Sequence, residues 1–306
     1  MIRQKTVFII GAGASQPYGY PTGRELREKI IQGGWLQKVD ISNGIPRIFI
    51  KKFNLSNNES IDLFLSRNKA QQGFTDLGKF VVFDTIYQAE SDSLSSPKPK
   101  NWDEIDWCSF LFNKMIEGID QLDELDRFKE NMCTFIIFNY DRSFEHNFFQ
   151  SLTNTFSSIP SKRILELFQT QKIFHVYGKI APLQWEDNNG LVYGQECDSI
   201  SRANFRQDLL LIGEERQNID TVTKQGILQE AERIIFLGFG FAQDNLQLLG
   251  FPQVLQDSCD VFGSGVGLYQ EEIDRFKYLI KANPNSVGKF MIEPGATCKD
   301  VLRKYL

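Results

Sequence analysis

Short apolar runs alternate with stretches of helical spacing along this chain of 306 residues. A continuous apolar run is typical of a strand that is buried on both faces, as in a parallel sheet. Runs of this kind predict strands at 7–10, 132–138, 172–176, 233–237, 266–269 and 289–292. Because helical stretches separate them, the sequence predicts an α/β fold with a Rossmann-like, mostly parallel sheet covered by helices on both faces.

Helical spacing is clear directly after the first strand and again in the second half of the chain. Residues 23–31 place Leu26, Ile30 and Ile31 on one face of a helix, and Gly33 follows as a stop signal. Further helices are expected over 143–152, 203–211, 217–231, 270–282 and 296–306.

The long stretch between the first two strands has no apolar run that predicts a strand. Its spacing is mostly helical, with a turn expected at 44–46 and a polar, proline-broken loop at 91–101. We therefore expect one domain, 1–306, with a helical insertion over 30–130 that lies over the end of the first strand. The insertion is either a lid or contact surface, or a plain covering layer.

Charge and composition exclude several classes of protein. The net charge is −5 and no block of Lys or Arg stands out, which argues against direct binding of nucleic acid. No run reaches the roughly 18 apolar residues that a membrane span needs. The chain enters its first strand within a few residues, so no signal peptide is expected.

Cysteine and histidine usage narrows the chemistry further. None of the five cysteines forms a C-x-x-C pair, so neither a disulfide framework nor a zinc site is indicated, and no metal is expected. A reducing cytoplasm is the expected setting. The two histidines are His146 and His175. His146 lies among phenylalanines on an expected helix and is interpreted as structural, which leaves His175 for imidazole chemistry.

A glycine-rich turn, 11–15, follows the first strand directly. Two glycines one residue apart let the backbone turn tightly and approach a ligand closely. A strand that ends in such a turn and leads to a helix presents N–H groups to a phosphate. The sixth position of the dinucleotide fingerprint is Gln16 instead of Gly, so a turn that uses its glycines only to turn stays an alternative.

Polar or glycine-bearing segments follow four of the expected strands. They are 11–15, 139–141, 177–179 and 238–241. In a parallel sheet, ligands bind beyond the carboxyl ends of the strands. We therefore expect these segments to meet at one rim of the sheet.

These segments together resemble a known family. The ordered set 11–15, 139–141, 175–178 and 238–241 is similar to the sirtuin-like NAD-binding family, and most to its bacterial branch found in anti-phage defence. Sirtuins carry G-A-G-x-S-x-x-x-G-I-P-x-F-R, and the resemblance runs through essentially the whole chain. The positions that match this motif are Gly11, Ala12, Gly13, Ser15, Gly19, Pro21 and Arg24.

The resemblance implies that NAD⁺ is the substrate and lies across the strand ends, with its pyrophosphate at the first turn. The residues that would bind it are Gly11, Ala12, Gly13, Ser15, Pro21, Arg24, Asp141, Tyr177, Gly238, Phe239, Gly240 and Asp244. Gly238 and Gly240 would let the fourth strand end close to the adenosine ribose or the pyrophosphate. Asp244 either binds a hydroxyl or caps a helix. A further G-x-G-x-G over 263–267 is interpreted as a flexible turn.

Cleavage of nicotinamide from ribose passes through an oxocarbenium-like state, as glycoside cleavage does. Asn139 can both donate and accept, so it can orient a water molecule and a ribose hydroxyl. By resemblance, Asp141 would accept from the nicotinamide carboxamide. The alternative for both residues is a cap on the following helix.

His175 is the expected general base, acting on a ribose hydroxyl. Sirtuins place His directly before Gly, but here Tyr177 holds that place and His175 lies two residues earlier. Residues two apart on a strand share a face, so His175 can reach the same cavity. Two alternatives stay open: Tyr177 supplies a hydroxyl instead, or His175 is a buried structural residue.

Two departures from the family argue against protein deacylation. The zinc-binding cysteine module is absent, and Gly23 replaces the Phe of the F-R pair. With water as acceptor, the chain is expected to be an NAD⁺ glycohydrolase with Asn139 and His175 as catalytic residues. Such an activity would harm its own cell, so restraint by a homo-oligomer or by a separate sensor or activator protein is expected. The alternative is a module that binds NAD⁺ or ADP-ribose without turnover.

Overall fold

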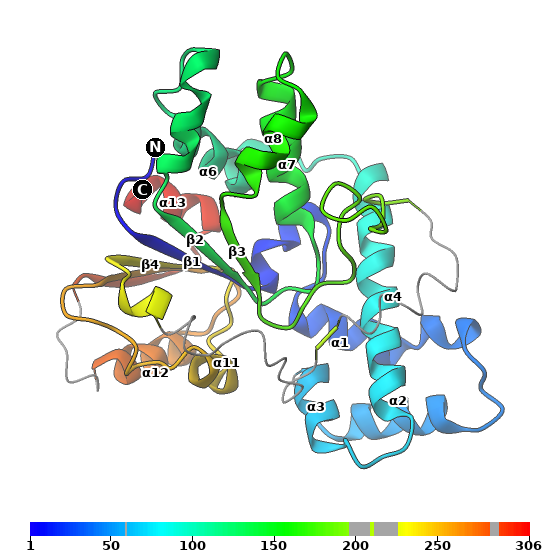
Figure 1. Cartoon of the computed structure of the whole chain (residues 1–306). Helices are drawn as coiled ribbons and strands as arrows, with labels where there is room; N and C mark the ends of the chain where they lie inside the picture. The colour runs from blue at the N-terminus through cyan, green and yellow to red at the C-terminus, as the bar shows by residue number, and fades with distance from the viewer. Residues whose placement is uncertain (59, 196–208, 211–225, 282–287) are drawn as a thin grey trace.

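A computed structural model of residues 1–306 describes the chain except at 59, 196–208, 211–225 and 282–287. Its centre is a six-stranded sheet in the order β3-β2-β1-β4-β5-β6, and every pairing is parallel (Figure 1). The strands are β1 (Thr6–Ile10), β2 (Cys133–Ile137), β3 (Lys172–His175), β4 (Arg233–Leu237), β5 (Asp260–Gly265) and β6 (Phe290–Pro294). The predicted Rossmann-like α/β fold is confirmed.

The strand order reverses beside β1, which lies at the middle of the sheet. Ile10 at the end of β1 pairs with Ile137 on one side and with Leu237 on the other. The chain builds β2 and β3 outwards on the first side before it returns to place β4 on the second. The carboxyl ends of β1 and β4 therefore form the point at which sheets of this kind bind ligands.

Helices cover both faces of the sheet because successive strand residues point to opposite sides. Phe8 and Ile10 lie in one core cluster, and Val7 and Ile9 lie in the other. The first face is covered by α6 (Trp107–Ile116), α7 (Ser143–Thr155), α8 (Ser161–Phe168) and α13 (Cys298–Tyr305). The second is covered by α1 (Gly23–Gln32), α4 (Phe74–Ser95), α11 (Gln243–Leu248) and α12 (Gln270–Lys281).

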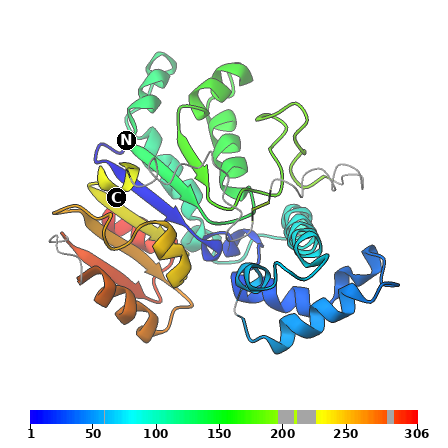
Figure 2. The same cartoon turned by 60° about the horizontal axis from the view of Figure 1, so that its bottom comes forward.

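In its described residues, the stretch between β1 and β2 contains helices joined by turns and no strand, as expected for the insertion. Its remaining elements are η3 (Gly34–Lys38), α2 (Ile45–Leu55), α3 (Ile61–Arg67), α5 (Trp102–Ile105) and η4 (Leu122–Glu130). The rings of Phe49, Phe53, Phe64 and Phe74 pack against one another in tilted and edge-to-face contacts and hold α2, α3 and α4 together. Figures 1 and 2 place this group of helices to one side of the sheet, apart from α11 and α12.

Several sequence predictions were wrong in position. The strand expected at 266–269 is β5, over Asp260–Gly265, so the G-x-G-x-G at 263–267 is mostly strand instead of a flexible turn. Glycine is needed at position 265 because a Cβ there would lie 2.2 Å from the Glu293 carbonyl oxygen of the neighbouring β6.

Two helix boundaries also differ, and one helix was missed. Pro46 opens helix α2 instead of a turn, since proline is well tolerated in the first helical turn. Helix α4 continues to Ser95, into the expected loop. Helix α8 was not expected. Most residues of the two helices predicted over 203–211 and 217–231 lie outside the described part of the chain.

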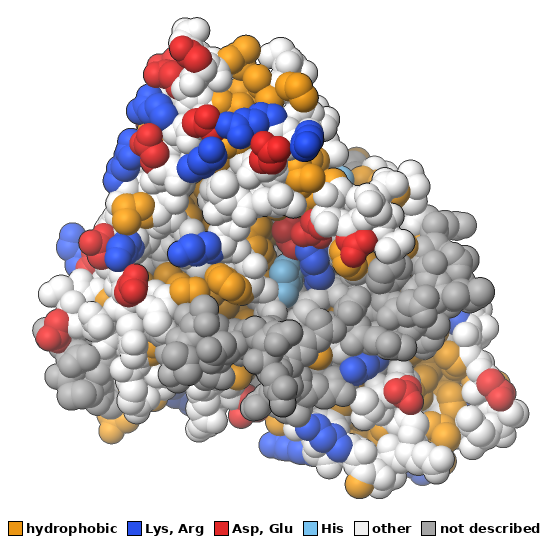
Figure 3. Space-filling view, in the orientation of Figure 1, with side chains coloured by type: hydrophobic (Ala, Val, Ile, Leu, Met, Phe, Trp, Pro, Cys, Tyr) orange, Lys and Arg blue, Asp and Glu red, His pale blue; other side chains and the backbone are white. Residues whose placement is uncertain are grey.

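No helix in the described part of the chain has the length and apolar character to cross a membrane. On the face seen in Figure 3, side chains of Lys and Arg alternate with those of Asp and Glu.

Candidate functional site

The glycine turn after β1 packs directly against the end of β4. The Gly11 N–H donates to the Leu237 carbonyl oxygen over 2.9 Å, and the Gly13 N–H donates to the Gly238 carbonyl oxygen over 3.0 Å. A Cβ on Gly238 would lie 1.9 Å from the Ala14 nitrogen. Gly11, Gly13 and Gly238 are therefore required for the two backbones to touch, which is a sufficient reason for their presence without a ligand.

Two short turns separate this glycine turn from the first long helix. They are η1 (Ala12–Ala14) and η2 (Gln16–Tyr18), and α1 begins only at Gly23. Thr22 closes the start of α1 in a capping box with Glu25. The N-terminus of α1 is thus not joined directly to the turn, as it is in the dinucleotide fingerprint.

Three N–H groups at the meeting point of β1 and β4 take part in none of the described hydrogen bonds. They belong to Ala12, Phe239 and Gly240. Gly240 is exposed and Ala12 is half-buried. Backbone N–H groups at this point of a parallel sheet are suitable donors for a phosphate. The Phe239 side chain is buried against Phe138 and packs in the core.

A buried polar cluster joins the glycine turn to the end of β2. Asn139 Nδ2 donates to Ser15 Oγ over 2.8 Å, and both side chains are almost fully buried. Ser143 Oγ lies 3.4 Å from Ser15 Oγ and donates to Asp141 Oδ1 over 2.5 Å. The predicted meeting of 11–15 with 139–141 at one rim of the sheet is therefore observed.

One atom of this cluster has no partner among the described residues. Asn139 Oδ1 is buried, and no described residue donates a hydrogen bond to it. A buried acceptor in a native structure is normally satisfied, and leaving it unpaired costs about 1–3 kcal/mol. Asn139 therefore presents an acceptor that suits a hydroxyl or water donor.

Asp141 has a local structural task. Its Oδ1 accepts from the Ser143 N–H over 3.0 Å in an Asx-type turn directly before α7, whose N-cap residue is Arg142. Burial raises the pKa of Asp141, although hydrogen bonds from Ser143 and Ser15 oppose the shift. Its predicted contact with a nicotinamide carboxamide stays a prediction.

His175, the last residue of β3, is held at both ring nitrogens. Nε2 lies 2.7 Å from Glu145 Oε1, and Nδ1 lies 3.2 Å from the Asn139 carbonyl oxygen. Each ring nitrogen therefore faces an oxygen atom. The ring lies beside Asn139, as predicted, but both of its nitrogens are already engaged.

Glu145 on α7 connects His175 to a short chain of charges. Lys179 Nζ lies 2.9 Å from Glu145 Oε1 and 2.7 Å from Glu186 Oε2. Burial by itself raises the pKa of Glu145, but the Lys179 ammonium and the His175 ring outweigh it and hold this pKa well below its usual range. Its second oxygen, Oε2, is buried and has no partner within the described structure.

Tyr177 extends the rim towards β4. Its hydroxyl donates to Asn245 Oδ1 on α11 over 2.7 Å. Burial, together with the charges of Asp62 and Asp244, raises the pKa of Tyr177 well above its usual value. Asp244 itself is exposed in the first turn of α11. Both of its predicted roles stay open.

The insertion contributes a carboxyl group to the same rim. Asp62, on α3, accepts a hydrogen bond from the Tyr140 hydroxyl. Burial raises the pKa of Asp62 to about 6, and the Tyr140 hydrogen bond opposes the shift.

Arg142 forms a second buried charged cluster next to Asp141. Its guanidinium bonds both carboxylate oxygens of Glu90 on α4, over 2.8 and 2.6 Å, and both side chains are fully buried. Its other donors bond the carbonyl oxygens of Pro182, Leu191 and Val192. This cluster ties the insertion to the loop that follows Lys179.

His146 has the structural environment expected for it. Its ring stacks on Tyr193, with the ring centres 3.6 Å apart. Burial and the charge of Arg142 lower the pKa of His146 to about 4.

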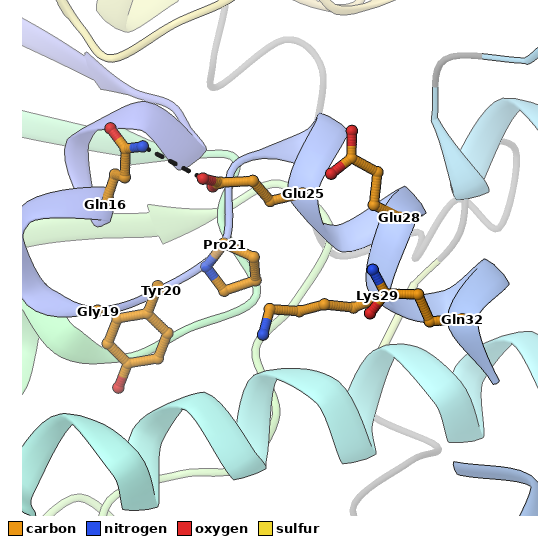
Figure 4. A pocket seen from close by; sticks show the side chains of 8 residues that line it. All are labelled: Gln16, Gly19, Tyr20, Pro21, Glu25, Glu28, Lys29 and Gln32. Atoms are coloured by element: carbon orange, nitrogen blue, oxygen red, sulfur yellow. Dashed lines mark hydrogen bonds between the residues drawn. The ribbon is translucent and has the colours of Figure 1, made fainter. Parts of the chain in front are cut away.

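A cavity of about 340 Å³ lies beside the glycine turn but on the α1 side of it. Figure 4 shows Lys29 reaching along α1 towards Tyr20, and Gln16 bonded to Glu25. The lining residues are Gln16, Gly19, Tyr20, Pro21, Glu25, Glu28, Lys29 and Gln32. Neither Asn139 nor His175 lines this cavity. Of the matched sirtuin positions, Pro21 is buried at its edge and Arg24 is exposed on α1.

Sequence reasoning missed several of these residues: Asp62, Glu90, Arg142, Ser143, Glu145, Glu186 and Asn245. A usable signal existed for two of them, because Arg142 and Glu145 are charged residues directly after the polar end of a buried strand. Among the described residues, no three His, Cys, Asp or Glu side chains gather in a way that would hold a metal ion.

The sheet order and the polar rim define a Rossmann-like parallel α/β protein whose strand-end residues meet at the point where the order reverses. No protein-family model matches the chain, and no curated protein matches it either.

Proposed function

We propose that this chain binds NAD⁺ at the rim formed by β1, β2, β3 and β4, and hydrolyses it to nicotinamide and ADP-ribose. The proposal rests on the resemblance of the strand-end motifs to the sirtuin-like NAD-binding family. It is supported by the position of these motifs where the sheet order reverses. The unused N–H groups of Ala12, Phe239 and Gly240 are suited to the pyrophosphate.

The observation that carries the proposal is the unpaired Oδ1 of Asn139. A ribose hydroxyl or the attacking water can donate to it, while Nδ2 keeps the amide oriented through Ser15. In the proposed reaction, Asn139 holds the water near the anomeric carbon while the bond to nicotinamide lengthens. Ser15 is expected to keep the amide from rotating as charge develops on the ribose.

A second candidate function is a module that binds NAD⁺ or ADP-ribose without turnover. The observation that favours it is the engagement of both ring nitrogens of His175. A general base needs a free lone pair within reach of the proton that it accepts. The predicted base role of His175 requires one of these two contacts to break. A protein deacylase is a weaker third candidate, for the reasons drawn from the cysteines and from Gly23.

The wider setting is part of the same proposal. An enzyme that depletes NAD⁺ must be restrained in its own cell, so we propose a regulated effector of anti-phage defence in the cytoplasm. Restraint by a homo-oligomer or by a separate sensor or activator protein is consistent with the extra helical insertion, whose residue Asp62 reaches the rim.

The test is incubation of the purified chain with NAD⁺ and measurement of free nicotinamide. Turnover that is lost in Asn139→Ala supports hydrolysis at this site, and turnover that is unchanged in that variant contradicts it. If the wild-type chain releases no nicotinamide, calorimetry with NAD⁺ and with ADP-ribose separates the binding module from a chain that has no such site.

A further inference from the structure

We propose that His175 is a positioning residue for Asn139 and acts through the Asn139 backbone carbonyl, with Glu145 as the residue that fixes the ring. This inference rests on the proposed function for its kinetic part. It assigns to Glu145 a role that the sequence did not suggest, and it replaces the general-base role that the sequence predicted for His175.

The His175 ring is held in place by contacts at both of its nitrogens. The His175 side chain is 9% exposed, and each of its nitrogens faces an oxygen acceptor. Contacts at both ring nitrogens hold the imidazole in one orientation. While both contacts persist, neither nitrogen is directed at a ribose hydroxyl.

Charged and polar groups surround the His175 ring. The groups that face it are the Glu145 carboxylate from α7, the Asn139 carbonyl from the end of β2, and Lys179 through the shared Glu145 oxygen. Glu186 lies on the far side of Lys179, nearer the surface. The Glu145 carboxylate is buried and contacts both Lys179 and His175, so the loss of either partner would leave a buried charge less fully paired.

The contact with His175 helps to fix the position of Asn139. The Phe138 N–H is bonded to the Ile10 carbonyl oxygen over 2.9 Å, and the Asn139 carbonyl is bonded to His175. The Asn139 side chain is bonded to Ser15. These contacts fix the backbone on both sides of the residue whose Oδ1 is unpaired. Loss of the contact to His175 frees the 139–140 peptide and hence the direction of that oxygen.

The test uses two substitutions that each keep one of the two contacts. The side-chain nitrogen of asparagine takes the place of Nδ1, so His175→Asn can still donate to the Asn139 carbonyl. The side-chain nitrogen of glutamine takes the place of Nε2, so His175→Gln can still donate only to Glu145. His175→Ala keeps neither, and Glu145 retains Lys179 in all three variants.

For the kinetic arm we expect His175→Asn to retain nicotinamide release within about threefold of wild type. We expect His175→Gln and His175→Ala to lose about tenfold or more, because both variants lack the hydrogen bond to the Asn139 carbonyl and free its peptide to leave the reactive geometry. Loss of kcat at unchanged Kd for NAD⁺ is the expected pattern. Equal losses of about 10²-fold or more in all three variants would be the behaviour of a general base and would overturn the inference.

The second arm needs no activity. Amide hydrogen exchange over 136–142 is measured in the ligand-free protein for the same three variants, with circular dichroism as the control for folding. We expect faster exchange in His175→Gln and His175→Ala and wild-type exchange in His175→Asn. Identical exchange in all three variants overturns the positioning role.

The two proposals fail separately. If wild type neither turns over nor binds NAD⁺, the proposed function fails, and the exchange arm alone then decides for or against the contact between His175 and Asn139.

Discussion

Arg142 and Glu145 lie close together at the start of α7, and each belongs to a cluster of charged side chains. The two clusters differ in one respect. In the first, all five guanidinium donors of Arg142 have acceptors on Glu90 or on backbone carbonyls. In the second, one Glu145 oxygen and the nearby Asn139 Oδ1 are buried without a described partner. The first cluster is complete within the protein, and the second has acceptors left for something else.

The comparison separates stability from function. A buried ion pair that satisfies every donor fixes two parts of a fold, and its loss leaves a charge without a partner. A buried acceptor without a partner costs free energy in the empty protein, and a ligand that donates to it recovers that cost. We therefore assign the Arg142 cluster to the fold and the Asn139–His175–Glu145 cluster to the site.

The largest expected effect is loss of the Arg142 cluster. Arg142→Ala leaves the Glu90 carboxylate buried without its cation, so we expect a loss of about 3–5 kcal/mol in the free energy of unfolding. Urea unfolding followed by circular dichroism measures it. Arg163→Ala, which breaks an exposed pair with Asp126, is the matched control and is expected to cost less than about 1 kcal/mol. A similar small loss in both variants would remove the basis of the comparison.

The sharpest test compares two buried asparagines. Asn131 bonds the Ile2 N–H and the carbonyls of Met115 and Phe128, so each of its polar atoms has a partner. Asn139 has an unpaired oxygen. We expect Asn139→Ala to lower NAD⁺ turnover by ~2 kcal/mol or more of transition-state stabilisation at little cost in stability.

Asn131→Ala is expected to do the reverse, with a loss of about 2 kcal/mol of stability and unchanged turnover for the fraction that remains folded. Nicotinamide release and urea unfolding of both variants give the two quantities. The assignment of Asn139 to the site is lost if its variant retains wild-type turnover.

The third effect concerns the backbone contact that closes the rim. Gly238 has φ +56°, and an added Cβ would lie 1.9 Å from the Ala14 nitrogen. We expect Gly238→Ala to destabilise the protein by about 2 kcal/mol, because left-handed strain and overpacking act together. Gly23→Ala is the control, since a Cβ at Gly23 meets nothing within 4 Å. Thermal unfolding of the two variants checks the difference, and equal melting temperatures would contradict it.

The smallest effect is a pH dependence that contrasts Asp62 with Glu145. The raised pKa of Asp62, about 6, means that the folded protein keeps this proton while the unfolded chain releases it near pH 4. Asp62 therefore makes the protein less stable as pH rises from about 4 to about 6. Glu145 has a lowered pKa, so its contribution is present at neutral pH and is lost only in acid.

We expect Asp62→Asn to be more stable than wild type at pH 7.5 by about 1–2 kcal/mol, and the gain to vanish near pH 4. Urea unfolding at both pH values measures the difference. A gain that does not change with pH would mean that Asp62 is ionised in both states.

Much of the fold could be predicted from the apolar runs, because a strand and the residues that end it are adjacent in the sequence. The apolar runs before Gly11, Asn139 and Gly238 are continuous and end in residues that break strands, so β1, β2 and β4 were expected within a residue or two of their observed limits. The run DVFGSG of β5 was missed because its glycines and serine look like a turn. Only the adjacent β6 backbone explains why glycine is needed there.

The sequence predicted which residues of the candidate site lie at the strand ends, but not which side chains they contact. The sequence by itself determined that Ser15 and Asn139 follow strands and that His175 ends a third strand, and parallel strands carry their ends to one rim. Tertiary structure alone decided that Glu145 binds His175, that Arg142 binds Glu90 and that Gly13 touches Gly238. These contacts join residues far apart in the chain, or residues whose meeting depends on how the helices cross the sheet. Hydrophobic periodicity carries no record of such pairing, because it reports which face is buried and not which polar groups meet there.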